Sequence, residues 1–278
     1  MLTTHGRKIP FIAKIEKPEA FRDIDAIIAV ADAIMVARGD LGVETSPQDV
    51  PIMQKTLIQK CNNAGKPVIT ATQMLESMIN NPRPTRAEAN DVANAILDGS
   101  DAVMLSAETA AGQYPIEAVR MMKNIALTVE TSEVFRNVVR GNVMSQQELR
   151  AHACLRIEDA VHFTTMDLAD KVCARYLVSF TNSGASVLGL AKFRPLMPLI
   201  AFSPKPSTLR KLALVWGVEP LQLGATYSVD DLLSSATEFL LNKGMAREGE
   251  IVVFSAGVPV GVSGGTNMIK VVKMARPD

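Results

Sequence analysis

The stretch IPFIAKIEKPEAF, residues 9–21, decides the fold class because it has the pattern of a buried strand followed at once by a helix. The strand is apolar until Lys14 and Glu16, and Pro18 stands where a first-turn proline belongs. Side chains two apart on a strand point the same way, so Lys14 and Glu16 share one face. Whatever meets that face must accommodate both charges.

The strand-then-helix pattern occurs four times before about residue 130. The expected strands are short, apolar on both faces and polar at their ends, which is typical of a parallel sheet covered by helices. Thr85 and Glu88 form a capping box at the start of one helix. The expected strands are 9–16, 33–40, 67–73 and 101–108, and the expected helices are 18–30, 47–62, 85–97 and 115–129.

A second alternating run follows the polar stretch GNVMSQQ, residues 141–147, which is the best linker. It predicts a small open sheet with helices on its faces. We therefore expect two domains, 1–142 and 143–278. The expected helices of the second are 158–170, 184–192, 206–216 and 229–243, and its expected strands are RYLVSF, PLIAF, PLQL, EIVVFS and IKVVKM.

The composition excludes several classes of protein. Lys plus Arg and Asp plus Glu both number 29, so there is no global basic field for nucleic acid or an anionic membrane. The three cysteines have no ligand spacing, which makes a disulfide framework or a zinc site improbable. No apolar run has the length of a membrane span. We expect a cytoplasmic protein.

Polar residues gather at the carboxyl ends of all four expected strands of the first domain. In parallel α/β architectures this edge binds ligands. Ordinary surface ion pairs explain any single set equally well, but four sets brought close together need mutual neutralisation or a cation. The sets are Lys14 and Glu16; Arg38, Gly39 and Asp40; Thr72 and Gln73; and Ser106 and Glu108.

Glu16 and Asp40 are hard oxygen ligands from adjacent strands, which suits Mg²⁺ together with substrate oxygens. Lys14 would face a bound anion from the other side, and one such contact is worth roughly 4 kcal/mol before desolvation is subtracted. In the turn ARGDLG, Gly39 permits close approach of a ligand to backbone donors. Taken alone, without Lys14 and Glu16, that turn is better explained as a tight turn that binds no ligand.

The chain contains the long segments IAKIEKPEAF, MVARGDLGVE, ITATQMLESMINNPRPTRAEANDVANAILDG and DAVMLSAETAAGQYP, and the short segments TNSGAS and GGTN. In order and in separation the long segments closely resemble pyruvate kinase, and the short ones resemble the C-terminal domain of that family. The first strand resembles the family's fifth. The resemblance therefore implies the last four units of a (β/α)₈ TIM barrel followed by a smaller open α/β domain.

The resemblance also implies roles for the polar residues. Lys14 would stabilise the transferred phosphoryl group and the enolate, Glu16 and Asp40 would bind the divalent metal, and Thr72 would lie near the carbon that is protonated. The substrate-binding set would be Ala37, Arg38, Gly39, Asp40 and Thr72, with Gln73, Ser106 and Glu108 in support. The implied reaction converts phosphoenolpyruvate and ADP to pyruvate and ATP, with Mg²⁺ or Mn²⁺ and usually K⁺.

The chain departs from the family pattern in one respect: four strand–helix units stand where the family has eight. The family segments that carry the K⁺ site, further phosphate-binding arginines and a lid domain have no counterpart. We therefore expect the C-terminal part of a pyruvate kinase, cut from a longer protein or encoded short, that does not turn over by itself. Unpaired edge strands invite self-association, and the family forms homotetramers.

The segment TNSGAS, residues 181–186, predicts a phosphate site because hydroxyls and backbone donors gather where a helix begins. Plain capping by Ser183 or Ser186 explains the residues at least as well. The family places a sugar-phosphate effector here, which implies contacts from Thr181, Asn182, Ser183, Gly184 and Ser186, and on the loop that holds Gly261, Gly264 and Gly265.

Two other functions remain open at this point. A Mg²⁺-dependent enolate aldolase on a related barrel also pairs a glutamate with an aspartate at strand ends. The segment ITATQMLES and the entire second domain argue against it. The other alternative is a non-catalytic regulatory or assembly module that binds phosphorylated effectors, which the missing half-barrel supports.

Overall fold

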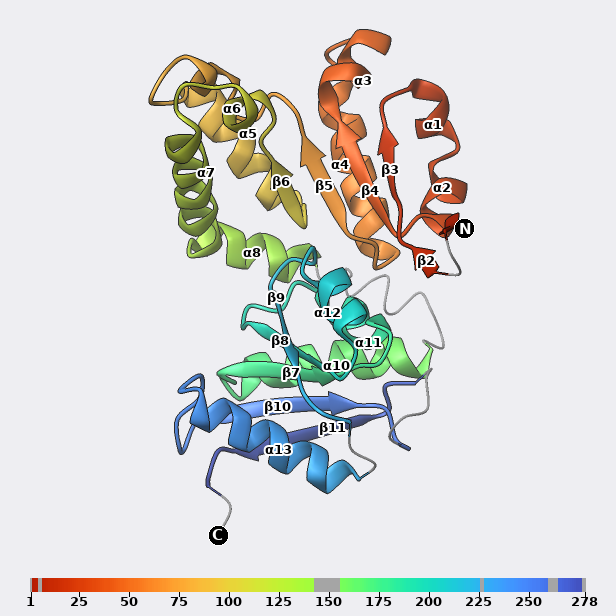
Figure 1. Cartoon of the computed structure of the whole chain (residues 1–278), viewed down its shortest axis with the longest axis vertical. Helices are drawn as coiled ribbons and strands as arrows, with labels where there is room; N and C mark the ends of the chain where they lie inside the picture. Colours follow the sequence, from red (N-terminus) through yellow and green to blue (C-terminus); the bar gives the residue numbers. More distant parts are fainter. Residues whose placement is uncertain (1, 5–6, 143–155, 226–227, 260–264, 277–278) are drawn as a thin grey trace. The chain divides into compact units, whose positions relative to one another are not determined.

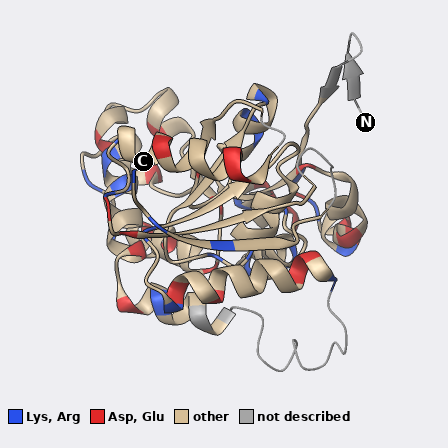
Figure 2. Cartoon of the chain, turned by 90° about the horizontal axis from the view of Figure 1, so that it is seen from below, with Lys and Arg blue, Asp and Glu red and all other residues tan. Residues whose placement is uncertain are grey.

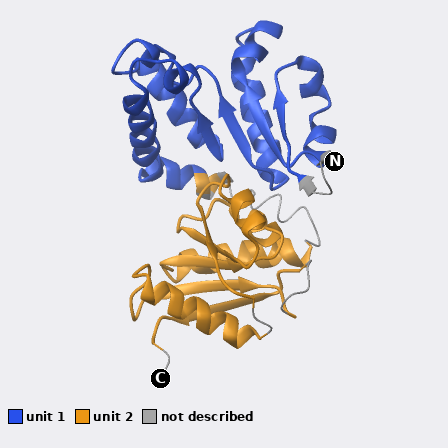
Figure 3. Ribbon diagram, in the orientation of Figure 1, with its two compact units in different colours: residues 1–138 blue, residues 139–278 orange. Residues whose placement is uncertain are grey.

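A computed structural model describes residues 2–4, 7–142, 156–225, 228–259 and 265–276 (Figure 1). The chain divides into two compact units, 1–138 and 139–278 (Figure 3). Most of the expected linker 141–147 lies outside the described residues, as do Gly261 and Gly264.

The first unit contains a four-stranded parallel sheet in the order β3-β4-β5-β6, so neighbours in the chain are neighbours in space. A short antiparallel hairpin, β1 and β2, precedes it. This arrangement confirms the predicted half-barrel class. The strands are β1 (Leu2–Thr4), β2 (Arg7–Ile9), β3 (Ile12–Ile15), β4 (Ala33–Ala37), β5 (Val68–Ala71) and β6 (Ala102–Met104).

The sheet packs against helices through a core that includes Ile15, Val36 and Leu57, all of them buried. Burying such side chains provides the main driving force for this packing. The helices are α1 (Pro18–Arg22), α2 (Ile24–Val30), α3 (Arg38–Glu44), α4 (Val50–Asn63), the 3₁₀ helix η1 (Glu76–Ile79), α5 (Arg86–Leu97), α6 (Ala107–Ala110), α7 (Pro115–Glu130) and α8 (Glu133–Asn142).

Several predicted boundaries in this unit are wrong. The single helix expected over 18–30 is two helices that meet at Asp23, a residue type that competes with the helical backbone for hydrogen bonds. The strand expected over 9–16 is interrupted at Pro10, which has no N–H to donate to a ladder. Nor is β3 apolar and buried on both faces, because Ile12 is 46% exposed.

The polar residues expected at the strand ends mostly lie just beyond them. β4 ends at Ala37 and Arg38 begins α3, while β5 ends at Ala71 and β6 at Met104. The backbone thus leaves the sheet before the residues of interest, which places them on turns and short helices above its carboxyl edge.

The second unit is a five-stranded sheet in the order β11-β10-β7-β8-β9. All neighbouring pairs are parallel except β10 with β11. The chain runs outward from β7 in one direction through β8 and β9, then returns to the other side of β7 as β10. The strands are β7 (Tyr176–Phe180), β8 (Leu199–Ser203), β9 (Val218–Gln222), β10 (Ile251–Ala256) and β11 (Met268–Lys273).

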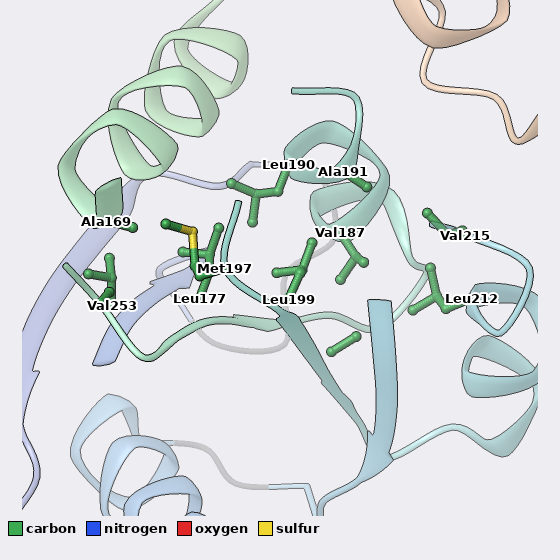
Figure 4. Packing of buried hydrophobic residues seen from close by; sticks show 12 residues of the cluster. Ala169, Leu177, Val187, Leu190, Ala191, Met197, Leu199, Leu212, Val215 and Val253 are labelled. Carbon is green, nitrogen blue, oxygen red and sulfur yellow. The ribbon is translucent and has the colours of Figure 1, made fainter. Parts of the chain in front are cut away.

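Both faces of this sheet are covered. One core cluster, shown in Figure 4, joins the sheet to residues of α10, α11 and α12, including Ala169, Leu190 and Leu212. A second cluster, with Leu240 of α13, lies on the other face. The helices are α10 (Ile157–Lys171), α11 (Ala185–Ala191), α12 (Pro206–Leu212) and α13 (Val229–Asn242).

Basic and acidic residues are interspersed over the helices and strands (Figure 2), in keeping with the balanced charge of the sequence. Among the described residues, none of the helices has both the length and the apolar character required to cross a membrane.

Candidate functional site

Three charged residues converge at the carboxyl edge of β3 and β4. Lys14 Nζ lies 2.6 Å from Glu16 Oε2 and 2.7 Å from Asp40 Oδ2. Lys14 belongs to β3, Glu16 follows its end, and Asp40 lies in the first turn of α3 directly after β4. Because β3 and β4 are adjacent and parallel, their carboxyl ends bring the three side chains together.

The mutual contacts alter the proton affinities of these groups. Hydrogen bonds to Asp40 and then Glu16 raise the pKa of the Lys14 ammonium above its ordinary value. The same hydrogen bond from Lys14 holds the pKa of the Asp40 carboxyl below its usual range. At neutral pH the Lys14 ammonium is therefore a cation beside the ionised Asp40 carboxylate.

Two carboxylates that approach a single cationic nitrogen also fit a small divalent cation. Mg²⁺ commonly takes one or two protein carboxylates and completes its shell with water and substrate oxygens. Within the described ranges, no group of three or more His, Cys, Asp or Glu side chains could hold a metal ion. A cation held by Glu16 and Asp40 would therefore need its remaining ligands from water or from a bound substrate.

Thr72 and Gln73 follow β5 with left-handed backbone conformations, at φ 69° and 55°. Positive φ is unusual outside glycine, and a β-branched residue such as Thr72 is a genuine outlier there. The Thr72 hydroxyl accepts a hydrogen bond from Gly39 N at 2.8 Å and donates to Ala71 O at 2.6 Å. Thr72 is thus fixed against the turn that carries Asp40.

Arg38, which directly precedes Gly39 at the start of α3, is only 9% exposed. Its guanidinium donates to Thr72 O at 2.6 Å and Gln73 O at 3.1 Å, and it pairs with Asp91 at 2.6 Å. The family resemblance assigned Ala37, Arg38 and Gly39 to a substrate-binding loop. In the structure the Arg38 side chain and the Gly39 N–H bond within the protein, and Ala37 is fully buried.

Ser106 and Glu108 connect β6 to the segment after Thr72 and Gln73. The Glu108 carboxylate is 2% exposed and accepts hydrogen bonds from Ser106 N at 2.7 Å and Leu75 N at 3.2 Å. These bonds run to backbone groups and not to the cluster of Lys14, Glu16 and Asp40. The two residues therefore support the loop and do not extend the charged cluster.

In the second unit the segment TNSGAS forms a tight turn before α11. Thr181 is buried, and its hydroxyl accepts a hydrogen bond from Gly184 N at 2.9 Å. Ser183 Oγ accepts one from Ala185 N at 3.4 Å. The N-cap residue of α11 is Gly184, at φ 94° and without a side-chain bond, so neither Ser183 nor Ser186 occupies the N-cap position. Asn182 O accepts a bond from Thr208.

Sequence reasoning missed two features of this unit. His162, to which the sequence assigned no role, is buried, and its Nε2 lies 3.1 Å from Thr266 Oγ1. Its partner is more than a hundred residues away in the chain, so no local spacing could have indicated the contact. Ser179 and Ser255 are register partners on β7 and β10, and both hydroxyls are buried without a hydrogen-bond partner among the described residues.

Comparisons with known proteins agree along most of the chain. Residues 1–119 match the family model of the pyruvate kinase barrel domain, and residues 159–272 match that of the pyruvate kinase alpha/beta domain. A pyruvate kinase of Sporosarcina psychrophila is 47% identical over 96% of this chain and 44% of its own length. One from Geobacillus stearothermophilus is 48% identical over 95% of the chain and 44% of its own length.

The solved structures agree as well. A crystal structure of a pyruvate kinase from Cryptosporidium parvum superposes with a TM-score of 0.87 at 36% identity, over 98% of this chain and 53% of that one. This chain thus spans about half the length of the relatives it matches.

Proposed function

The chain belongs to the pyruvate kinase family, and from this premise we propose that Lys14, Glu16 and Asp40 take part in phosphoryl transfer between phosphoenolpyruvate and ADP. The observation that carries the proposal is the approach of both carboxylates to Lys14 Nζ, at 2.6 and 2.7 Å. Phosphoryl transfer depends mainly on positioning and on charge neutralisation, and this cluster offers both.

Glu16 and Asp40 would hold Mg²⁺ or Mn²⁺. When bound, such an ion neutralises charge on phosphate and enolate oxygens. Glu16 directly follows β3, and Asp40 lies in the first turn of the helix that follows the adjacent strand β4, so the paired strands bring their backbones together. Asp40, with a lowered pKa, presents an ionised carboxylate throughout the neutral range.

Lys14 would contact the transferred phosphoryl group and the enolate oxygen. Its raised pKa keeps the ammonium charged at neutral pH. A charged ammonium stabilises the anionic transition state by direct electrostatic attraction.

Thr72 would position the proton that reaches the enolate carbon. Its hydroxyl is held by Gly39 N and Ala71 O, so its location relative to Asp40 is defined before a ligand binds. Such prior positioning removes part of the entropic cost of the reaction.

The remaining partners are proposed mainly from membership of the family. We infer ADP and ATP as nucleotide substrates, K⁺ as a second cation, a sugar-phosphate effector at residues 181–186, and assembly into a homo-oligomer. The buried Thr181 hydroxyl and the left-handed Gly184, which give residues 181–186 a defined shape, support the effector site. Both matching family models describe pyruvate kinase domains, so they lend no support to an aldolase.

The proposal is tested by titrating the full chain with Mn²⁺ and recording free Mn²⁺ by electron paramagnetic resonance. We expect Glu16→Gln and Asp40→Asn each to weaken binding by about tenfold or more. Lys14→Met should tighten it, because no ammonium then competes for the carboxylates. The exposed Glu19→Gln is the matched control and should bind like the wild type.

Pyruvate formation from phosphoenolpyruvate and ADP is measured in parallel with a coupled assay. Equal Mn²⁺ affinity in the wild type, Glu16→Gln and Asp40→Asn would overturn the metal assignment. Undiminished pyruvate formation by Lys14→Met, in a preparation whose wild type is active, would overturn the role of Lys14.

A further inference from the structure

We propose that Asp91, acting through Arg38, is a positioning residue that holds Thr72 and Gln73 in their left-handed backbone conformation. The proposal rests on the role proposed above for Thr72. Asp91 lies on α5 and its carboxylate contacts Arg38 rather than Lys14, Glu16 or Asp40.

The conformation of Thr72 and Gln73 needs an external restraint. Two consecutive residues other than glycine have positive φ, and each raises the free energy of the folded backbone. Such a pair persists only when its surroundings impose it. The imposed geometry is local, because β5 ends in regular conformation at Ala71 and η1 begins at Glu76.

Arg38 supplies that restraint. Its Nη2 donates to Thr72 O at 2.6 Å and to Gln73 O at 3.1 Å, so one nitrogen binds both carbonyls of the left-handed pair. Its Nε lies 3.3 Å from Thr72 O as well. The planar guanidinium offers these donors in a fixed arrangement that a lysine ammonium cannot reproduce.

Asp91 in turn fixes Arg38. The guanidinium is 9% exposed, and a buried cation requires a paired anion. Asp91 provides it, with Oδ1 and Oδ2 at 2.7 and 2.6 Å from Nη1. Among the residues that the structure describes, the same nitrogen has one further acceptor, the neutral Gln54 Oε1 at 3.4 Å. Without the Asp91 charge the guanidinium would lose its principal partner.

The helix that carries Asp91 is itself anchored to the loop. Glu88 caps α5 with Thr85 and also accepts hydrogen bonds from Ser77 N and Oγ at 2.7 and 2.5 Å. Ser77 lies in η1, a few residues after Gln73. Asp91 therefore acts from a helix that is fixed relative to the strained segment.

The first test compares crystal structures and urea unfolding of the wild-type chain, Asp91→Asn, Gln73→Gly and the double variant. In Asp91→Asn we expect Thr72 or Gln73 to leave the positive-φ region. We also expect Asp91→Asn to lower the urea midpoint, and glycine at position 73 to recover about half of that loss or more, since glycine needs no restraint there.

If the ion pair only stabilised the fold, the changes in urea midpoint caused by Asp91→Asn and by Gln73→Gly would add in the double variant. A departure from additivity therefore separates positioning from stabilisation. Asp91→Glu keeps the negative charge, so it should retain the positive φ values and most of the wild-type urea midpoint. This variant still tests the proposal if Asp91→Asn does not fold. The exposed Glu117→Gln is the charge-matched control and should change neither measurement. Unchanged φ values together with additive losses would overturn the proposal.

A second measurement connects the proposal to the reaction. We expect Asp91→Asn to lower the kcat for solvent exchange of the pyruvate methyl protons by about tenfold or more. The variant should retain its affinity for Mn²⁺. Loss of Mn²⁺ affinity in this variant would contradict a role confined to Thr72. If the wild-type chain shows no exchange, as expected for a part of the enzyme that does not turn over by itself, the structural coupling between Asp91 and Gln73 in the first test decides the proposal.

Discussion

His162 is buried against α11 and the segment before β11, and burial lowers its pKa from 6.5 to about 4. The charged groups around it are Lys192, Asp159, Glu158 and Arg156, of which Lys192 contributes next after burial. Between these two pKa values the unfolded chain binds a proton that the folded chain does not. Folding stability therefore falls as the pH is lowered through this window and is fully present above it.

Replacing His162 with Gln, which retains a polar contact for Thr266, should remove this pH dependence. Between about pH 7.5 and pH 4 the wild type should lose up to about 3 kcal/mol more unfolding free energy than the variant. Urea unfolding of both chains across this range, followed by circular dichroism, measures the difference. Parallel pH profiles would show that the His162 proton is not coupled to folding.

For single residues, the sequence predicts which charged side chains lie together, but it does not predict unusual backbone conformations. Lys14, Glu16 and Asp40 could be placed together because strand parity and parallel pairing are short-range rules. The left-handed Thr72 could not be predicted, since no glycine marks it and its restraint comes from Arg38, 34 residues earlier. The family resemblance names Arg38 as a substrate contact, which stays a prediction; in the structure its guanidinium binds the carbonyls of Thr72 and Gln73 and the Asp91 carboxylate.

Among the elements, α5 shows that a short sequence motif can fix the residue at which a helix begins. The capping box predicted at Thr85 and Glu88 is confirmed, with Glu88 N donating to Thr85 Oγ1 and Thr85 N donating to Glu88 Oε2. Thr85→Ala should lower the unfolding free energy by about 1 kcal/mol, because the helix loses one of its end caps. Urea unfolding measures this, with the exposed Arg86→Ala as the control; equal losses in the two variants would contradict the capping role.

Element boundaries were predicted less well than element types, and the reasons are local. Pro10 divides the first strand and Asp23 divides the first helix, two effects of backbone chemistry that a purely apolar pattern does not register. Strand ends were placed too late because polar residues were included in the strand, whereas the chain turns before them, as at Ala37.

For the whole molecule, the alternation of strands and helices sufficed to predict that each half of the chain forms a sheet covered by helices. The strand order of the second sheet, in which β10 lies beside β7 and not beside β9, was not predicted. The second sheet has buried clusters on each of its two faces, the first around Leu199 and the second around Phe254. A sheet covered on both sides has the core that independent folding requires. We therefore expect residues 139–278, expressed alone, to unfold cooperatively in urea.

Leu199→Ala tests this expectation in the isolated segment. Leu199 is fully buried, so the truncation should cost about 2–5 kcal/mol, from lost burial and from the cavity left behind. Val271→Ala, at a side chain that is 41% exposed on β11, should cost far less. Circular dichroism and tryptophan fluorescence follow the unfolding, the latter through Trp216. A gradual, non-cooperative loss of signal, or equal effects of the two substitutions, would mean that this segment lacks a specific core of its own.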